Sequence, residues 1–386
     1  MADEVVLGLI GCGGMMGAHV NGYKALWNAG LRDFRIAATC DIEVARAEKL
    51  ATDVAAFQGA KPTVYTDFQK MLDAEKSLDA ADLSLVHRDH HKVAIPCLQA
   101  GKHVTIEKPL AITCRAAKAI IDAAKKAKRL LQTAENYRRA PDQRAIRWAL
   151  ANQRIGGLRM LYWIDVGERL WYWAWRDHRD LAGGGWSMDG GVHFADLFRY
   201  HVGDVKSLYA VSCAHFPTRY RKHETLEEPI AATVEDTTLA VIEFDNGVNG
   251  QWTSTMAAPG RGFNQRAIYG SKGSINWGVG LKTRTEEVAM ADLIEQHNKA
   301  LSGDEREKLF PRGVTDAVAT ELWEFVQAIQ GKAKIETDGV EGLKALAICM
   351  AIYESSWLGK PVEVAKVELC KIENYQADLN EAAGLK

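Results

Sequence analysis

Short apolar runs alternate with longer amphipathic stretches through the first third of the chain. The run at 5–10 is continuous, as is typical of strands buried on both faces of a parallel sheet, and further strand-like runs follow at 34–41, 81–87 and 103–107. The stretches that follow them have helical periodicity, and Thr113 opens the last of these. Strands that alternate with helices predict a right-handed βαβ array, and so a doubly wound parallel sheet, as far as about residue 135.

The rhythm changes near residue 138, where we place a domain boundary. Strand-like runs now follow one another with short turns such as Asp245-Asn246-Gly247 between them. These runs occupy 158–168, 205–216, 235–247, 248–255 and 264–277. They predict a mostly antiparallel sheet that a helix can cover on one face.

Helical patterns return at about 314–331 and 339–358. The pattern as a whole predicts an α/β chain with domains at 1–138 and 139–386. The second domain is of the α+β type, and its C-terminal helices can pack back on the first.

Length and charge narrow the class of protein. A chain of 386 residues exceeds one ordinary core and favours two domains. With 48 basic and 50 acidic residues the net charge is −2, so we expect no nucleic acid and no membrane as partner. No apolar run reaches the ~18 residues of a membrane span, and the first residues lack a signal-peptide pattern. The balanced charge favours a protein that handles a small molecule. The seven cysteines form no C-x-x-C pair, so we expect reduced thiols in a cytoplasmic protein.

The stretch GCGGMMGAHV at 11–20 lies between the first apolar run and a helical stretch. A glycine-rich turn in that context places phosphate groups over the free N–H groups at the start of the helix. The cofactor-binding residues predicted here are Gly11, Gly13, Gly14, Met15 and Met16. The usual G-x-G-x-x-G spacing would put a third glycine at position 16, for close packing between helix and strand. Because the chain has Met16 there, Gly17 or Ala18 could serve in its place if the helix starts one residue late, and we expect Gly17 to relieve the packing.

Asp41 ends the second apolar run, 24 residues after Gly17 and close to the ~20 expected for an acid that accepts a hydrogen bond from a ribose hydroxyl. A carboxylate there repels a 2′-phosphate, so the sequence favours NAD over NADP. Arg46 is near enough in the sequence to weaken that preference. The alternative is that the glycines form an ordinary tight turn and Asp41 only ends a strand.

Glu107, Lys108 and Pro109 stand at the carboxyl end of the fourth apolar run, where ligands bind in doubly wound sheets. Pro109 keeps Lys108 out of the helical region, so the lysine projects from rigid, extended backbone. An ammonium group held in this way can donate a hydrogen bond to an alcohol oxygen as negative charge develops on it.

A second candidate group lies in GGGWSMDGGVHFADL at 183–197. If a helix starts near Asp189, then His193 and Asp196 share one of its faces. The three glycines at 183–185 would let the backbone approach a bound ligand, and a histidine in the first turn can act as a base. Taken alone, His193 is more often a structural histidine and Asp189 a helix cap. The lysine and the Asp/His face together favour catalysis.

These motifs occur together in one known family. In order and spacing, GLIGCGG, AGKHVTIEKPL at 100–110 and AGGGWSMDGGVHFADL at 182–197 resemble the Gfo/Idh/MocA oxidoreductases, which are sugar, inositol and glycoside dehydrogenases. VEDTTLAVIEFDNG and IYGSKGSI at 268–275 are similar to sheet strands of that family, so the resemblance covers most of the chain. It implies a Rossmann domain followed by an α+β domain on a large open sheet that often makes oligomer contacts.

The resemblance also assigns roles to individual residues. It implies that Lys108 and His193 are the catalytic lysine and histidine and that Asp189 is the acid one turn before. The expected cofactor contacts further include Glu107, Lys108, His87 and His90. Here the chain departs from the family, because LVHRDHH at 85–91 replaces a T-P-containing turn. Its side chains are also of metal-ligand types, but we expect a solvated loop and no metal.

We hypothesise that a secondary alcohol on a sugar ring is oxidised to a ketone. His193 takes the hydroxyl proton while hydride passes to NAD⁺, Lys108 stabilises the developing alkoxide, and Asp189 orients the alcohol or the histidine. The predicted substrate contacts are Trp175, Arg176, Asp189, His193 and one of Arg138 and Arg139.

The tryptophan-rich segment at 168–186 bears on the substrate, because aromatic faces bind the C–H faces of sugar rings. It favours a glycoside or a larger aglycone over a small phosphorylated sugar. Trp171, Trp173 and Trp175 alternate like one face of a strand, so core packing or a subunit contact is an equal alternative.

Three functions remain open at this stage. The first is a dehydrogenase that releases NADH and acts on a sugar, inositol or glycoside. The second is a glycosidase or transhydrogenase that keeps NAD tightly bound and recycles it. The third is a non-catalytic sugar or NAD sensor on the same fold. A homo-oligomer, whether dimer, tetramer or hexamer, is expected through the sheet of the second domain.

Overall fold

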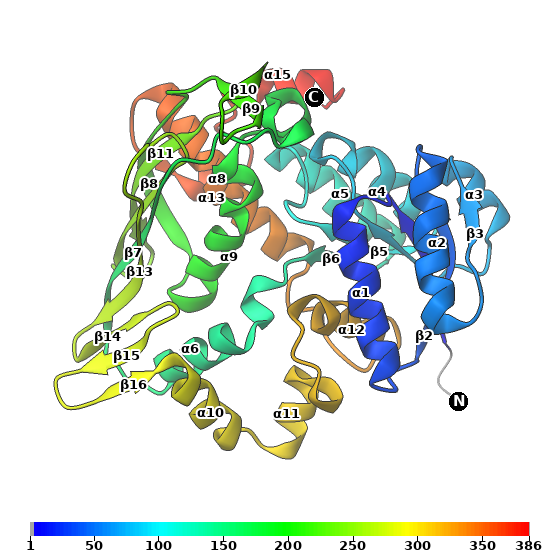
Figure 1. The fold of residues 1–386 in the computed structure, drawn as a ribbon, viewed down its shortest axis with the longest axis horizontal. Helices are drawn as coiled ribbons and strands as arrows, with labels where there is room; N and C mark the ends of the chain where they lie inside the picture. Colours follow the sequence, from blue (N-terminus) through cyan, green and yellow to red (C-terminus); the bar gives the residue numbers. More distant parts are fainter. Residues whose placement is uncertain (1–3, 386) are drawn as a thin grey trace. The chain divides into compact units, whose positions relative to one another are not determined.

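The computed structural model describes residues 4–385, which form two compact units (Figure 1). The first comprises the chain up to residue 111 together with 116–140 and 302–342, and the second comprises 112–115, 141–301 and the chain from residue 343. The chain thus enters each unit more than once. None of the helices formed by the described residues is both long and apolar enough to cross a membrane.

A six-stranded parallel sheet is the centre of the first unit. Its strands are β1 (Val5–Ile10), β2 (Phe34–Cys40), β3 (Thr63–Tyr65), β4 (Ala80–Leu83), β5 (His103–Glu107) and β6 (Leu131–Ala134). They lie in the order β3-β2-β1-β4-β5-β6, which is the order of doubly wound dinucleotide-binding sheets. The predicted Rossmann fold is confirmed. The apolar pattern did not predict β3 and β6, because strands of 3 and 4 residues are too short to show one.

The first unit also contains helices from distant parts of the chain. They are α1 (Gly14–Asn28), α2 (Val44–Gln58), α3 (Phe68–Ala74), α4 (His90–Gln99), α5 (Cys114–Ala127), α11 (Gly303–Leu309) and α12 (Ala317–Ile329), with 3-10 turns η1 (His87–Asp89), η2 (Tyr137–Arg139) and η4 (Pro311–Gly313). Although α12 comes late in the sequence, it packs beside α1 (Figure 1). Phe325 of α12 joins Leu7, Tyr23 and Phe34 in one buried core.

The start of α1 differs from the expectation. The helix begins at Gly14, not one residue late, and Met16 is completely buried in the core. A Cβ built on Gly17 would meet no atom within 4 Å, so Gly17 relieves no contact and that expectation is wrong. The close approach comes later, at Gly22, where a Cβ would lie 3.2 Å from the backbone nitrogen of Ala319 on α12.

A nine-stranded sheet is the centre of the second unit. In spatial order its strands are β16 (Glu287–Ala289), β15 (Gly280–Thr283), β14 (Gly273–Asn276), β13 (Phe263–Gly270), β7 (Leu158–Val166), β12 (Asn249–Thr255), β11 (Thr237–Phe244), β8 (Val205–Cys213) and β17 (Val362–Glu363). Its pairings are antiparallel except for the parallel pair of β7 and β12. The predicted large, mostly antiparallel sheet is confirmed. A separate hairpin consists of β9 (Thr218–Lys222) and β10 (Glu227–Ala231).

The helix that carries His193 lies against one face of this sheet (Figure 1), and aromatic side chains pack between the two. Trp163 of β7 and Trp252 of β12 are cross-strand neighbours. They pack against Phe194 and Phe198 of α9 (Gly191–His201), with ring centroids 4.6 and 5.4 Å apart. The remaining helices of the unit are α6 (Pro141–Ala151), η3 (Ala174–Asp177), α7 (Arg179–Ala182), α8 (Trp186–Asp189), α10 (Met290–Ala300), α13 (Gly339–Leu358), α14 (Val364–Glu368) and α15 (Ala377–Ala382).

The tryptophan-rich segment after β7 is not a strand. It makes isolated bridges at Glu168 and Trp171 and then enters η3, which contains Trp175. Ala174 adopts a left-handed φ of 56°, which interrupts an extended chain. Trp171, Trp173 and Trp175 therefore do not share one strand face, and that interpretation is wrong.

Two glycine variants on α1 test this packing. We expect Gly17→Ala to stabilise the protein by about 0.5–1 kcal/mol, because alanine favours helix and meets open space. We expect Gly22→Ala to destabilise it, because overpacking against the α12 backbone costs roughly 1–3 kcal/mol. Urea unfolding of the cofactor-free protein measures both, and equal effects of the two variants would contradict the packing described for α1.

Candidate active site

The glycine-rich loop joins β1 to α1 at the carboxyl edge of the parallel sheet. Gly11 has a φ of +85°, and a Cβ there would lie 2.1 Å from the carbonyl oxygen of Ser84, so only glycine fits. Gly13 is the N-cap of α1, so no side chain caps the first N–H groups of the helix. A Cβ on Gly13 or Gly14 would meet no atom within 4 Å. Open space over uncapped N–H groups fits the pyrophosphate of a dinucleotide.

Asp41 is bound to this loop. Its Oδ2 accepts a hydrogen bond of 2.7 Å from the backbone N–H of Cys12, and its Oδ1 accepts one of 2.8 Å from Glu43. The side chain is 8% exposed. The acid that the sequence pattern assigned to the ribose therefore also holds the loop in place, which the pattern did not predict.

Glu107 and Lys108 lie at the carboxyl end of β5. Glu107 is buried, and its Oε2 accepts a hydrogen bond of 3.1 Å from the backbone N–H of Lys108. Its Oε1 lies 2.9 Å from Nε2 of His19 on α1. The Lys108–Pro109 peptide bond is cis. Sequence reasoning missed His19, whose only signal was a polar residue on the buried face of a helix, three positions after Met16.

The three histidines of the LVHRDHH segment are buried within η1 and the start of α4, whereas Arg88 and Asp89 are partly exposed, so the expectation of a solvated loop is wrong for the histidines. His87 is the first residue of η1, and the completely buried His90 is the first residue of α4. The ring nitrogens of His90 lie 3.3 and 3.2 Å from the carbonyl oxygens of Leu110 and Leu85. Burial, with a smaller effect of His87, lowers the pKa of His90 to about 4, so the ring is neutral at pH 7. Cofactor contacts of His87 and His90 stay a prediction.

Four of the residues predicted to meet substrate lie in the second unit. Asp189 is the last residue of α8, and His193 lies in the first turn of α9; they are 7% and 8% exposed. Arg176 donates a hydrogen bond of 3.0 Å from Nε to Oδ1 of Asp189. Its guanidinium lies 4.3 Å from the ring centroid of Trp175. Charge pairing and stacking together orient the Asp189 carboxylate.

The glycines at 183–185 also have a packing role that was not expected. A Cβ on Gly184 would lie 2.2 Å from Oη of Tyr353, and one on Gly185 would lie 2.5 Å from the carbonyl oxygen of Glu235. Gly183 has a φ of +84° and meets the backbone of Ile112. Interior packing by itself therefore requires these glycines, and close approach of their backbone to a ligand stays a prediction.

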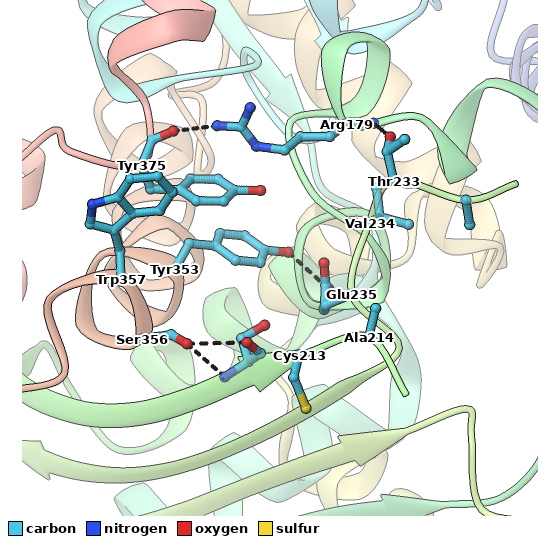
Figure 2. Close-up of a pocket in the computed structure, with 12 residues that line it drawn as sticks. Arg179, Cys213, Ala214, Thr233, Val234, Glu235, Tyr353, Ser356, Trp357 and Tyr375 are labelled. Atoms are coloured by element: carbon cyan, nitrogen blue, oxygen red, sulfur yellow. Dashed lines mark hydrogen bonds between the residues drawn. The ribbon is translucent and has the colours of Figure 1, made fainter. Parts of the chain in front are cut away.

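The buried carboxylate of Glu235 binds the backbone at the start of α8, and Figure 2 shows the hydrogen bond that it accepts from Tyr353. Glu235 accepts hydrogen bonds of 2.7 Å from the N–H of Gly185, 3.0 Å from the N–H of Ser187 and 2.9 Å from the hydroxyl of Tyr353. Burial raises its pKa, while these hydrogen bonds lower it. Glu235 and Tyr353 line a cavity of about 430 Å³ together with residues such as Arg179, which pairs with Asp378 at 2.6 Å.

Half-buried tryptophans lead from the segment after β7 to α8. Trp173 stacks on Trp186 with ring centroids 5.3 Å apart and an interplanar angle of 28°. Trp171 meets Trp173 edge to face at 6.0 Å, and the guanidinium of Arg169 lies 5.8 Å from the ring of Trp186. Trp171, Trp173 and Trp186 thus form a row of contacting rings, here called the aromatic wall, and Trp186 lies on α8, the helix that carries Asp189.

Arg138, like Arg139, lies in the first unit, whereas the other predicted substrate contacts lie in the second. It is buried, with nitrogens 3.8 Å from Glu336 and 3.7 Å from Glu341. Arg139 pairs with Glu324 at 2.6 Å. The substrate role of Arg138 stays a prediction. Among residues 4–385, no group of His, Cys, Asp and Glu is arranged to hold a metal ion.

Comparison with protein families bears directly on both units. Residues 5–135 match the description "Oxidoreductase family, NAD-binding Rossmann fold", and residues 147–364 match "Oxidoreductase family, C-terminal alpha/beta domain". Fold and motifs thus define a two-domain NAD-dependent oxidoreductase. The chain belongs to the Gfo/Idh/MocA family. Its members include NAD-dependent sugar dehydrogenases, so the chain is a dehydrogenase that acts on CH–OH groups with NAD as cofactor.

Individual relatives cover nearly the whole chain. Levoglucosan dehydrogenase of Pseudarthrobacter phenanthrenivorans is 28% identical over 92% of this chain and 98% of its own length. D-glucoside 3-dehydrogenase of Escherichia coli is 26% identical over 86% of this chain and 91% of its own length. A solved structure of levoglucosan dehydrogenase in complex with NADH and levoglucosan has a TM-score of 0.75 at 24% identity, with 93% of this chain and 99% of that chain covered. That structure shares the fold.

The position of Asp41 leads to a cofactor prediction. Asp41→Asn keeps an acceptor for the N–H of Cys12 but removes the charge that would face a 2′-phosphate. We expect the ratio of the NADP and NAD dissociation constants to fall at least about tenfold, since like charges in contact cost several kcal/mol. Quenching of tryptophan fluorescence measures both constants. The exposed neighbour Glu43→Gln is the control, and an unchanged ratio in Asp41→Asn would count against the predicted ribose contact.

Proposed function

We propose that the protein oxidises a secondary hydroxyl of a neutral sugar, inositol or glycoside to a ketone, with the C3 hydroxyl of a glycoside as the foremost candidate. The observation that carries the proposal is the arrangement on α8 and α9. Asp189 is paired with Arg176, Arg176 stacks on Trp175, and His193 lies one turn further along. An aromatic face beside a guanidinium suits a sugar ring with hydroxyl groups.

The chemistry divides between the two units. The first binds the dinucleotide through Gly11, Gly13 and Gly14 and presents Lys108. When bound, NAD⁺ supplies the hydride acceptor. Lys108 donates a hydrogen bond to the substrate oxygen as negative charge develops there, and His193 accepts the hydroxyl proton. The alcohol thus loses a proton and a hydride and becomes a ketone.

Asp189 and Arg176 orient the substrate. The Arg176 guanidinium retains N–H groups that can donate to a sugar hydroxyl beyond the one bonded to Asp189. The aromatic wall of Trp171, Trp173 and Trp186 favours a glycoside with a large aglycone over a phosphorylated sugar. Two relatives are named for glycoside-like substrates, levoglucosan and D-glucosides, which supports this choice.

A substrate panel tests the proposal. The purified protein, first assayed for co-purified NAD, is incubated with NAD⁺ and inositols, aldoses, sugar phosphates, and alkyl and aryl glycosides, and NADH is followed at 340 nm. We expect the highest kcat/KM with neutral glycosides. Lys108→Ala should lower kcat by about 10²–10⁴-fold while NAD still binds. Lys49→Ala, an exposed lysine of α2, is the matched control.

Other outcomes identify the competing functions. Release of an aglycone without net NADH favours an enzyme that keeps and recycles its NAD. Tight NAD binding with no absorbance change for any compound favours a sensor. A fully active Lys108→Ala variant removes the lysine from the mechanism.

We also propose that the protein forms a homo-oligomer through the outer face of the nine-stranded sheet. This face is defined by Tyr209 and Val211 on β8, Leu239 and Val241 on the neighbouring strand β11, and Met160 on β7, and all five side chains are exposed. In register, Leu239 lies opposite Val211 and Val241 opposite Tyr209. Contiguous exposed apolar side chains are typical of an interface.

All seven cysteines, which lie within the described residues, are free thiols, and we propose a cytoplasmic location.

A charge on this face tests the interface. Val241 is 63% exposed, and Val241→Glu should shift the mass measured by light scattering toward the monomer, because an interface cannot bury an unpaired carboxylate without cost. Val279→Glu, at a position 66% exposed in a turn of the same unit, is the control. A wild-type monomer, or an unchanged mass for Val241→Glu, would exclude this interface.

A further inference from the structure

A buried histidine connects the helix of the glycine-rich loop to the strand that presents Lys108. His19 lies on α1 and is completely buried. Its Nδ1 lies 3.0 Å from both carboxylate oxygens of Asp82 on β4, and its Nε2 lies 2.9 Å from Oε1 of Glu107 on β5. The imidazole thus bridges two neighbouring strands of the parallel sheet.

This geometry defines the charge of the ring. Carboxylate oxygens only accept hydrogen bonds, so an imidazole with a carboxylate on each side donates from both nitrogens and is an imidazolium. Burial alone lowers the pKa of His19, but Asp82 and Glu107 outweigh burial and hold it well above the ordinary value. The cation is therefore kept at neutral pH.

The surrounding groups complete the network. The Tyr23 hydroxyl donates a hydrogen bond of 3.0 Å to Oδ2 of Asp82. Glu321 on α12 is also buried, and burial raises its pKa well above the ordinary value, which favours its neutral form. Its charged neighbours include Arg139 and Glu135 in addition to His19 and Glu107. The central charges are thus one imidazolium and two carboxylates.

Glu107 passes this constraint on to the lysine. One carboxylate oxygen is held by His19, and the other accepts the hydrogen bond from the backbone N–H of Lys108. A carboxylate fixed at one oxygen has little freedom to turn at the other. The N–H of Lys108 therefore has a fixed partner at the residue from which its side chain projects.

We propose that His19 is a positioning residue for Lys108. Through Glu107 it fixes the backbone at the carboxyl end of β5 and so aims the ammonium group. The proposal rests on the proposed role of Lys108 in alcohol oxidation. A histidine that only stabilised the fold would affect stability without a particular effect on Lys108.

The first test needs neither cofactor nor substrate. Individual lysines of the wild-type protein and His19→Asn are labelled with acetic anhydride at trace level, and peptides are quantified by mass spectrometry. We expect labelling of Lys108 to rise at least about threefold in His19→Asn, since loss of the anchor loosens the local backbone. Labelling of Lys49, an exposed lysine on α2, should not change.

Tyr23→Phe is the matched control for a general loss of stability. It removes one hydrogen bond from the same Asp82 but leaves the contact between His19 and Glu107. We expect a lower unfolding midpoint with Lys108 labelling and kcat within about twofold of wild type. If His19→Asn does not fold, Glu107→Gln breaks the charged link at its other end and should raise Lys108 labelling in the same way.

Kinetics supply the second test. With the best substrate of the panel, His19→Asn should lower kcat by about 10–100-fold with little change in the NAD dissociation constant, because small misplacement of a reacting group has effects of this size. In a Lys108→Ala background the same substitution should have no further effect, which a double-mutant cycle measures.

The outcomes separate the two proposals. Unchanged Lys108 labelling in His19→Asn and Glu107→Gln would overturn the role of His19, as would an equal rise in Tyr23→Phe. An undiminished effect of His19→Asn in the Lys108→Ala background would do the same. A wild-type protein inactive on every substrate would overturn the proposed function alone, because the labelling test reports the reactivity of the Lys108 amine without cofactor or substrate.

Discussion

The buried ion cluster of His19, Asp82 and Glu107 is the constraint on which the first unit depends. Charges removed from water are stable only when each is paired and hydrogen-bonded, so a rotation of α1 relative to β4 and β5 would break these pairs at a cost in stability. The start of α1 defines the glycine-rich loop, and the end of β5 carries Lys108. One set of electrostatic contacts therefore fixes the cofactor loop and the proposed catalytic lysine relative to each other.

The second unit supports its proposed reactive groups, Asp189 and His193, in a similar way. The Glu235 carboxylate is buried behind α8 and binds two backbone N–H groups and a tyrosine hydroxyl. The pairs of Trp163 with Phe194 and of Trp252 with Phe198 hold α9 against the sheet. The backbones that carry Asp189 and His193 are therefore held in place by buried contacts. This suits groups that must meet a substrate in one geometry.

Much of the fold was predictable because its cause is local. Continuous apolar runs separated by amphipathic stretches predict the doubly wound sheet, and runs separated by short turns predict the antiparallel one. Of the site, the positions of Asp41, Lys108 and His193 at element ends followed from motif spacing, whereas Asp189, expected at the start of the helix that carries His193, is the last residue of α8. The roles of Gly17 and of the glycines at 183–185 did not follow from spacing, because they depend on atoms of α12, Tyr353 and Glu235 that are distant in the sequence.

The sequence by itself determined the class of fold, the NAD-binding loop and the order of the chemical groups, since each is carried by residue types at short spacing. Only the tertiary structure decided which groups are charged partners. His19 is read from the sequence as one polar residue in a helix, but in the fold it lies between carboxylates from two strands. Arg176 likewise meets Asp189 only because η3 and α8 fold together. Such contacts join residues that are far apart in the sequence. They depend on which elements the fold brings together, and the local pattern of residues does not encode this.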